Sequence, residues 1–319
     1  MAHNSVSNST VVLPVEYGKE IIRGVLGRSK ALELGRRLPN MLGKTYKLNV
    51  NAHLPVAGWV SGQSTPNNSD EPDIKNKPVS YYAFEGKDVV AEEIAVIIPV
   101  SINTLNDVED FGIALLPEIT EQVQAAFAEV IDATIFFGVN APWASFNGIV
   151  ADATTKGKTV QWDGQSGTSF YHAVDEAMEY VENSGYVPTA ILGGPSLNSA
   201  FRKTITTLGV LAGDQGEIGA LPRHVDLTGG FNQSSAFAIV GDFRYLVYSF
   251  REELSMRVLY EATLKDPATG TELYNLAQQD MIGLRFTMRL GAQLPNPVNR
   301  VGGASQYPFA VITKAGASA

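Results

Sequence analysis

Residues 107–139, with the sequence DVEDFGIALLPEITEQVQAAFAEVIDATIFFGV, decide the predicted architecture of this chain. From Pro117 onward, apolar residues recur at helical spacing on one face: Ile119, Val123, Ala126, Phe127, Val130 and Ile131. Polar side chains fill much of the other face: Glu118, Glu121, Gln122, Glu129 and Asp132. Pro117 suits a first helical turn, where its missing N–H is no loss, and Gly138 is a suitable stop. We predict a helix of roughly 30 Å, long enough to run the length of a domain.

The composition indicates a globular protein without a membrane span. Its 319 residues are 45% hydrophobic, which suits one large domain or two linked ones. No apolar run reaches 18 residues, and the N-terminus lacks the features of a signal peptide. Cysteine is absent, which excludes disulfides, thiolate metal sites and cysteine nucleophiles.

The charge is unevenly distributed along the chain. Residues 1–50 contain eight Lys and Arg against three Glu, a net charge of +5. The whole chain has a net charge of −9, so the residues after position 50 together carry −14. Tight binding of nucleic acid needs clustered basic residues to neutralise phosphates. The acidic body therefore argues against such binding through the main surface of the protein.

Two segments before the long helix lack a core of their own. Residues 16–37 read as a weak amphipathic helix in which each of four glycines costs about 1 kcal/mol relative to alanine. This segment needs a surface supplied by another part of the molecule or by a neighbour. Residues 44–60 and 81–100 have strand patterns around a polar connection, which predicts a long projecting hairpin. Such hairpins bury little of themselves and persist where a partner covers them.

The rest of the chain alternates short helices and strands. We predict helices at residues 170–183, with Ser169 as N-cap, and from Ser196 through Lys203. A short strand is expected at 189–192 and one long strand at 281–293, with 309–313 pairing near the latter. The sum is an α+β fold.

No catalytic, cofactor or metal constellation emerges from the sequence. The four histidines are scattered, and none has metal-ligand spacing with another histidine or a carboxylate. The turn GGPS at residues 193–196 lacks the lysine of a phosphate loop and the glycine pattern of a nucleophile elbow. We therefore expect no enzyme activity, no cofactor and no metal. In the absence of such a site, a structural role is the favoured interpretation.

The order of these elements resembles the major capsid proteins of tailed bacteriophages, which share the Hong Kong 97-type fold. The resemblance is carried by short pieces over about 280 residues: 57–62 (AGWVSG), 98–107 (IPVSINTLND), 132–138 (DATIFFG), 146–149 (FNGI), 240–243 (VGDF) and 280–289 (DMIGLRFTMR). It implies five parts: an N-terminal arm (1–45), an extended E-loop (46–102), a P domain with a spine helix (103–144), an A domain (145–277) and a return strand of the P domain with the C-terminus (278–319).

The resemblance also implies where subunits meet and bend. Interface residues are expected in the arm and the E-loop: Ile21, Ile22, Val25, Leu26, Trp59, Lys75, Lys77, Tyr81, Tyr82 and Phe84. Candidate hinges lie at bends in the chain: Gly58, Gly62, Pro117, Gly138 and Pro142. Some relatives link subunits through a Lys–Asn isopeptide bond. Because Asp280 falls where that asparagine would lie, we predict no covalent link, although Lys75, Lys77 and Lys87 are present.

The function implied is that of the head shell subunit of a double-stranded DNA phage. The chain would form homo-pentamers and homo-hexamers of an icosahedral shell, assembled in the host cytoplasm, that touches its DNA only weakly. Scaffolding, portal and decoration proteins are candidate partners, and no membrane is expected. Two alternatives remain: an encapsulin-like nanocompartment that packages an enzyme, and an α+β hydrolase or transferase.

Overall fold

The computed structural model describes residues 28–58, 79–110, 115–164, 168–203, 221–302 and 305–314. The described helices are α1 (Lys30–Leu34), α2 (Ile102–Asp110), α3 (Leu115–Phe137), α4 (Ile149–Thr155), α5 (Thr168–Glu182), α6 (Ser196–Lys203) and the 3-10 turn η2 (Phe243–Tyr245). The longer strands are β2 (Thr45–His53), β3 (Ala83–Val90), β4 (Glu92–Ser101), β9 (Val247–Leu259), β12 (Met281–Gln293) and β13 (Phe309–Lys314). The shorter strands are β1 (Arg36–Arg37), β5 (Thr159–Trp162), β6 (Ala190–Gly193), β7 (Arg223–Val225), β8 (Ala238–Gly241), β10 (Thr263–Lys265) and β11 (Glu272–Asn275).

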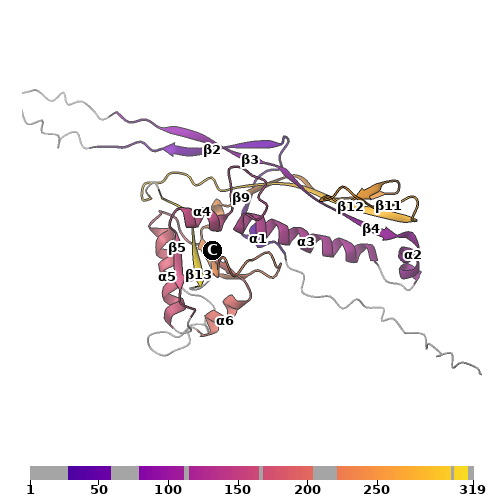
Figure 1. The fold of residues 1–319 in the computed structure, drawn as a ribbon. Coiled ribbons are helices and arrows are strands. Elements are labelled where there is room, and N and C mark those ends of the chain that lie inside the picture. The colour runs from indigo at the N-terminus through magenta and orange to yellow at the C-terminus, as the bar shows by residue number, and fades with distance from the viewer. Residues whose placement is uncertain are drawn as a thin grey trace, which may run out of the picture.

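A four-stranded sheet in the order β1-β9-β12-β4 packs against α3 (Figure 1). β12 is antiparallel to β4 on one side and to β9 on the other, so most of its length is paired twice. Its buried residues alternate along the strand, as one covered face requires: Ile282, Leu284, Phe286, Met288 and Leu290. The predicted long strand at 281–293 is confirmed.

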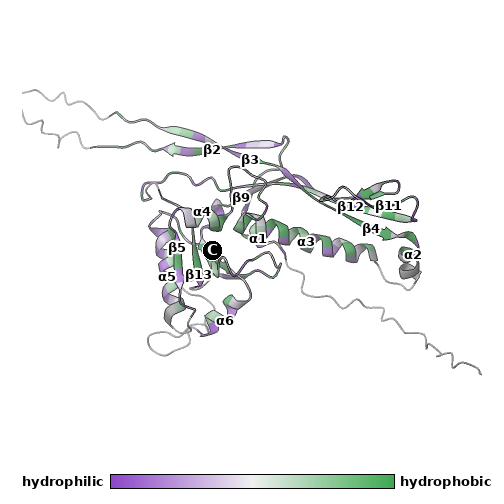
Figure 2. Cartoon of the chain, in the orientation of Figure 1, coloured by the Kyte–Doolittle hydropathy of each residue, from purple (hydrophilic) through white to green (hydrophobic). Residues whose placement is uncertain are grey.

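A second sheet, in the order β5-β13-β8-β6-β7, forms the centre of a more compact body with α5 (Figure 1). β13 pairs with β5 and β8, so the expected pairing of residues 309–313 near the long strand is wrong. The central strands β6 and β8 are buried along their whole length because helices and loops cover both faces. Figure 2 shows hydrophobic residues recurring along α3.

One hydrophobic core joins the two sheets. It contains α3 residues such as Phe127 and Ile135, β12 residues such as Phe286, and residues such as Phe309 and Val311 from the second sheet. Its continuity means that α3, the long strand and the near face of the second sheet are held as one body. A second cluster lies between α5 and the other face of the five-stranded sheet.

The buried face of α3 differs from the prediction. Val123, Phe127 and Ile131 are buried as expected, but Ala126 is exposed and Val130 is 47% exposed. Asp132, predicted on the polar face, is completely buried. The difference arises because α1 packs on this side of the helix and brings donors to the Asp132 carboxylate.

Two other local predictions are corrected. A continuous helix over 16–37 is wrong for its described part, since α1 ends at Leu34 and Arg36–Arg37 pairs with β9. Gly35 takes an extended conformation that lets the Arg36 N–H bond to the Leu246 carbonyl. Ser169 lies inside α5 rather than at its N-cap, because the helix begins at Thr168.

The end of α3 is a junction between two glycines. Gly138 has a φ of +70° and Gly148 a φ of +94°, both in the left-handed region. A Cβ at Gly138 would lie 2.0 Å from the Asn147 carbonyl oxygen, and one at Gly148 would lie 2.4 Å from the Gly138 nitrogen. The two backbones therefore approach more closely than any side chain would permit.

We expect Gly148→Ala to destabilise the subunit by several kcal/mol, because the added methyl group would clash with backbone atoms of Gly138 that cannot move away. Gly157→Ala is the matched control: its φ is +67°, yet nothing lies within 4 Å of the added Cβ. The control is expected to cost only about 1 kcal/mol of backbone strain. Guanidinium denaturation of both variants measures the difference, and equal transition midpoints would contradict the packing argument.

Candidate functional site

The hairpin formed by β2 and β3 presents apolar side chains to solvent. Tyr81 is 67% exposed, Tyr82 50% and Phe84 61%, and Val79 is almost fully exposed. The hairpin projects from the body in Figure 1, and β2 pairs only with β3 among the described strands. A two-stranded hairpin is marginal in water, so this surface is suited to being covered by another molecule.

The exposed aromatic residues are held in fixed positions by contacts within the hairpin. The Tyr82 hydroxyl donates a hydrogen bond of 2.8 Å to the Asn51 side-chain oxygen. The Tyr82 and Phe84 rings meet edge to face with centroids 4.7 Å apart, and His53 lies against Tyr81 at 4.9 Å. Ordered aromatic rings lose little conformational entropy on binding, which favours their use as contact residues.

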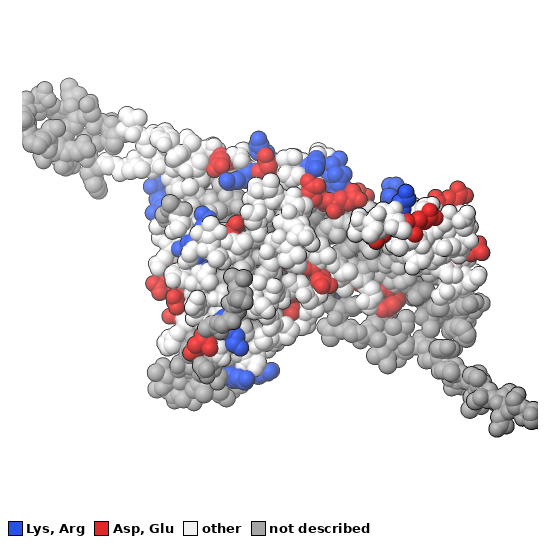
Figure 3. All heavy atoms as spheres, in the orientation of Figure 1, with Lys and Arg blue, Asp and Glu red and all other residues white. Residues whose placement is uncertain are grey.

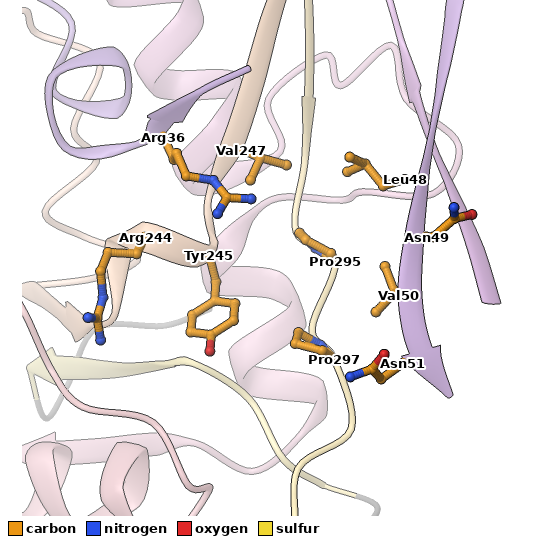
Figure 4. Close-up of a pocket in the computed structure, with 10 residues that line it drawn as sticks. All are labelled: Arg36, Leu48, Asn49, Val50, Asn51, Arg244, Tyr245, Val247, Pro295 and Pro297. Atoms are coloured by element: carbon orange, nitrogen blue, oxygen red, sulfur yellow. The ribbon is translucent and has the colours of Figure 1, made fainter. Parts of the chain in front are cut away.

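The hairpin meets the body at its base, where Val89 is completely buried, and through hydrogen bonds to Asn51 and Pro55. The Val298 N–H donates to the Asn51 carbonyl at 3.1 Å, and the Arg300 guanidinium donates to the Pro55 carbonyl at 3.0 Å. A cavity of about 430 Å³ lies beside this contact. Figure 4 shows Pro295 and Pro297 between Tyr245 on the body side and Leu48 and Val50 on the hairpin strand. Space beside the attachment leaves the hairpin room to change its angle to the body.

The return strand of the predicted hairpin is divided between two sheets. β3 pairs with β2, whereas β4 begins two residues later and pairs with β12. The indole N–H of Trp143, in the loop after α3, donates to the Val90 carbonyl at 2.8 Å. This bond fixes the point where the hairpin strand passes into the long sheet.

A buried carboxylate attaches the chain preceding the hairpin to α3. Asp132 accepts hydrogen bonds from the Ser29 hydroxyl at 2.6 Å, the Lys30 N–H at 2.9 Å and the Ala31 N–H at 3.0 Å. These donors form the first turn of α1, where Ser29 is the N-cap. α1 is too short to be stable alone, so the Asp132 contacts fix its position.

Burial raises the pKa of Asp132 from 3.8 to about 6. The three donors lower the pKa and so oppose this effect, while the nearby charge of Asp226 adds to it. One Asp226 oxygen accepts two bonds from Thr228, and the other is buried without a partner. Sequence reasoning missed this site because Asp132 follows the polar spacing of an exposed helix face. The only available signal was an N-cap serine before a weak helix.

The other predicted residues are placed as follows. Ile21, Ile22, Val25, Leu26, Trp59, Gly62, Lys75 and Lys77 lie outside the described residues. Of the candidate hinges, Gly58 is exposed after the end of β2, Pro117 lies in the first turn of α3, and Gly138 and Pro142 follow the end of α3. The structure brings the Tyr82 and Phe84 rings into contact and places Tyr81 against His53. The four candidate hinges within the described residues lie in different segments of the chain.

The described residues contain no group of three or more His, Cys, Asp or Glu side chains that could hold a metal ion. Over the same part of the chain, no helix has the length and hydrophobicity needed to cross a membrane. Charged residues of both signs alternate over the hairpin base and the far end of the long sheet in Figure 3. The face seen there has no continuous basic surface.

Comparison with known proteins identifies the family. The model of the phage capsid family matches residues 9–299. The chain belongs to the phage capsid family. No curated protein matches it at a significant level.

Solved structures from phages agree with this assignment. A chain of Microbacterium phage Oxtober96 is 29% identical, with a TM-score of 0.79, over 95% of this chain and 96% of its own. Chains of Mycobacterium phages Adephagia and Cain are each 26% identical with a TM-score of 0.81. The first match covers 98% of both chains, and the second covers 99% of this chain and 100% of its own.

The protein is therefore a major capsid protein of a tailed bacteriophage, with a mixed α and β fold. Phage capsid proteins are structural shell components, not enzymes. They assemble into shells of many copies of one chain. In a capsid protein, exposed aromatic residues on a projecting hairpin are candidate contacts between copies.

Replacing Asp132 by Asn should destabilise the subunit, because the amide group offers a donor where an acceptor is needed. We expect a loss of roughly 1–3 kcal/mol at neutral pH. The pH dependence has a definite sign. Between pH 3.8 and about 6 the folded state keeps a proton that the unfolded state has lost, so the stability contributed by Asp132 falls as pH rises through this window.

Guanidinium denaturation of wild type and Asp132→Asn between pH 4 and pH 7 measures this effect. The advantage of the wild type should shrink by on the order of 3 kcal/mol across the range, since only the wild type titrates at this position. Asp175→Asn, an exposed position on α5, is the control and should stay within about 0.5 kcal/mol of wild type. An advantage that is constant with pH would contradict the assigned burial effect.

Proposed function

We propose that copies of this chain form pentamers and hexamers of an icosahedral phage head, in which the β2–β3 hairpin of one copy covers its neighbour. The observation that carries the proposal is the exposure of Tyr81, Tyr82 and Phe84 on a projecting hairpin that forms a separate two-stranded sheet. Burying one such ring against a neighbour contributes about 1.5–3 kcal/mol, and each copy would repeat the contact.

In this proposal the parts of the chain have separate tasks. The hairpin acts as the E-loop, α3 and the four-stranded sheet form the P domain, and the five-stranded sheet with α5 forms the A domain. Residues before α1 form the N-terminal arm. Because β13 belongs to the five-stranded sheet, the C-terminal segment returns to the A domain after β12 passes through the P domain.

One chain must fit several environments in such a shell, so it must bend. The cavity beside the hairpin base and the exposed position of Gly58 support bending of the hairpin. Pro117, Pro142 and Gly62 remain proposed hinges. Gly138 is proposed as a point where the A and P domains change their angle, although its close contact with Gly148 permits only small movements.

The shell would enclose double-stranded DNA with weak direct contact and would be assembled in the host cytoplasm. The net charge of −9 supports this, since strong contact with phosphates requires basic clusters. Scaffolding, portal and decoration proteins are proposed partners. No covalent link between copies is proposed, because Asp280 offers a carboxylate rather than the amide that a lysine would attack.

A double variant of the hairpin tests the role of its rings. Tyr82→Ser with Phe84→Ser should leave the subunit folded, since both rings are exposed, but should abolish closed shells in electron micrographs of the expressed protein. Tyr171→Ser, an exposed aromatic position on α5, is the control and should still assemble. Normal shells from the double variant would overturn the proposed hairpin contact. Enzyme cargo in place of DNA within shells made during infection would overturn the phage head proposal.

A further inference from the structure

A groove between α3 and β9 is lined by apolar side chains. Its volume is about 720 Å³, larger than that of the cavity at the hairpin base. The apolar lining residues come from α3, α1 and two strands of the long sheet: Leu32, Ala125, Phe127, Ala128, Ile131, Phe250, Leu254 and Met288. Arg28, Glu121 and the Arg37–Glu253 ion pair lie at its rim. The groove therefore suits a short apolar segment with charged flanks.

The chain itself enters the structure at this groove. Arg28 and Ser29 both line it, and Ser29 is fixed at the Ile131 end of the groove by its bond to Asp132. The 27 residues that precede Arg28 lie outside the described structure. Four apolar residues follow one another closely in that segment, at positions 21, 22, 25 and 26, and Leu26 is only two residues from Arg28.

We propose that residues 19–27 fold back into this groove of their own subunit, with Ile21, Ile22, Val25 and Leu26 against its apolar floor. This inference goes beyond the proposed shell, because it replaces the contact between subunits that the resemblance implies for these four residues with an intramolecular site that exists before copies meet. The short link through Gly27 favours the subunit's own arm over that of a neighbour, since tethering gives a high effective concentration.

The lengths of the groove and of the segment agree. Ten residues of α3 separate Glu121 from Ile131, a distance of about 15 Å along the helix. A helix covers about 14 Å in the nine steps from Arg28 to Lys19, which keeps all four apolar residues within the groove. An extended chain covers about 16 Å in the five steps from Arg28 to Arg23 and would carry Ile21 and Ile22 past the end of the groove. A helical segment therefore matches the groove in length as well as in its apolar residues.

Engineered cysteines test the contact directly, since the chain has none of its own. Val25→Cys combined with Ala125→Cys should form an intramolecular disulfide under mild oxidation, seen by non-reducing electrophoresis and mass spectrometry. Val25→Cys with Ala151→Cys is the control, because Ala151 is an exposed alanine on α4 outside the groove. No link to position 125, or equal linkage to both positions, would overturn the inference.

Mixing isotope-labelled and unlabelled copies of the Val25→Cys, Ala125→Cys double variant separates a subunit's own arm from that of a neighbour. Links within one chain support the inference, whereas links between labelled and unlabelled chains would overturn it in favour of a neighbour's arm. Full-length chains are used both before and after assembly. Linkage in unassembled subunits that fail to form shells would support the groove site even if the proposed shell function were wrong.

A second measurement does not require new bonds. Leu254→Asp places a charge in the groove floor and should make trypsin cleavage after Arg23 about ten-fold faster or more, because the arm would lose apolar contacts. Leu273→Asp, at an exposed leucine of β11, should leave the rate unchanged. If Leu254→Asp folds and its cleavage rate equals that of wild type, the groove does not hold the arm. If this variant fails to fold, the cysteine pairs still test whether the arm lies in the groove.

Discussion

The packing of α3 against the long strand β12 is the contact on which the rest of this subunit depends. Phe127, Ile131 and Ile135 on the helix and Leu284, Phe286 and Leu290 on the strand share one core. The same core continues into the five-stranded sheet through Phe309 and Val311. Removing this contact would separate the two sheets from each other, not merely loosen one helix. The most buried part of the molecule is therefore also the part that fixes the relative position of its two bodies.

The peripheral segments are attached by a different kind of interaction. The hairpin base uses hydrogen bonds such as Val298 to Asn51 and Trp143 to Val90, and α1 uses the donors around Asp132. Directional bonds of this kind contribute about 1 kcal/mol each and specify position more than they add stability. A subunit built in this way keeps a firm body while its extensions can change angle. That division suits the proposed shell, in which copies of one chain would occupy unequal positions.

Much of this fold could be predicted because its strongest signals are local. The helical spacing after Pro117, the strand alternation at 281–293 and the polar gap between two strand patterns each depend on neighbouring residues. The wrong predictions share one cause: each concerns residues whose position depends on contacts with a distant segment of the chain. Asp132 is buried only because Ser29 reaches it from 103 residues away, and residues 309–313 pair with β5 and β8 rather than with the nearer β12. No periodicity within one segment could have shown either contact. Tyr81, Tyr82 and Phe84 were expected at subunit contacts from the family resemblance, and all three are exposed in the structure.

The double pairing of β12 has a mechanical consequence. The strand runs between β4 and β9, both antiparallel to it, and its C-terminal end leads into the segment that holds the hairpin. A pull on the hairpin would therefore load β12 along its own axis. The hydrogen bonds on either side lie perpendicular to that direction and must fail together rather than one by one. The long strand can thus carry tension from the projecting hairpin into the body of the subunit.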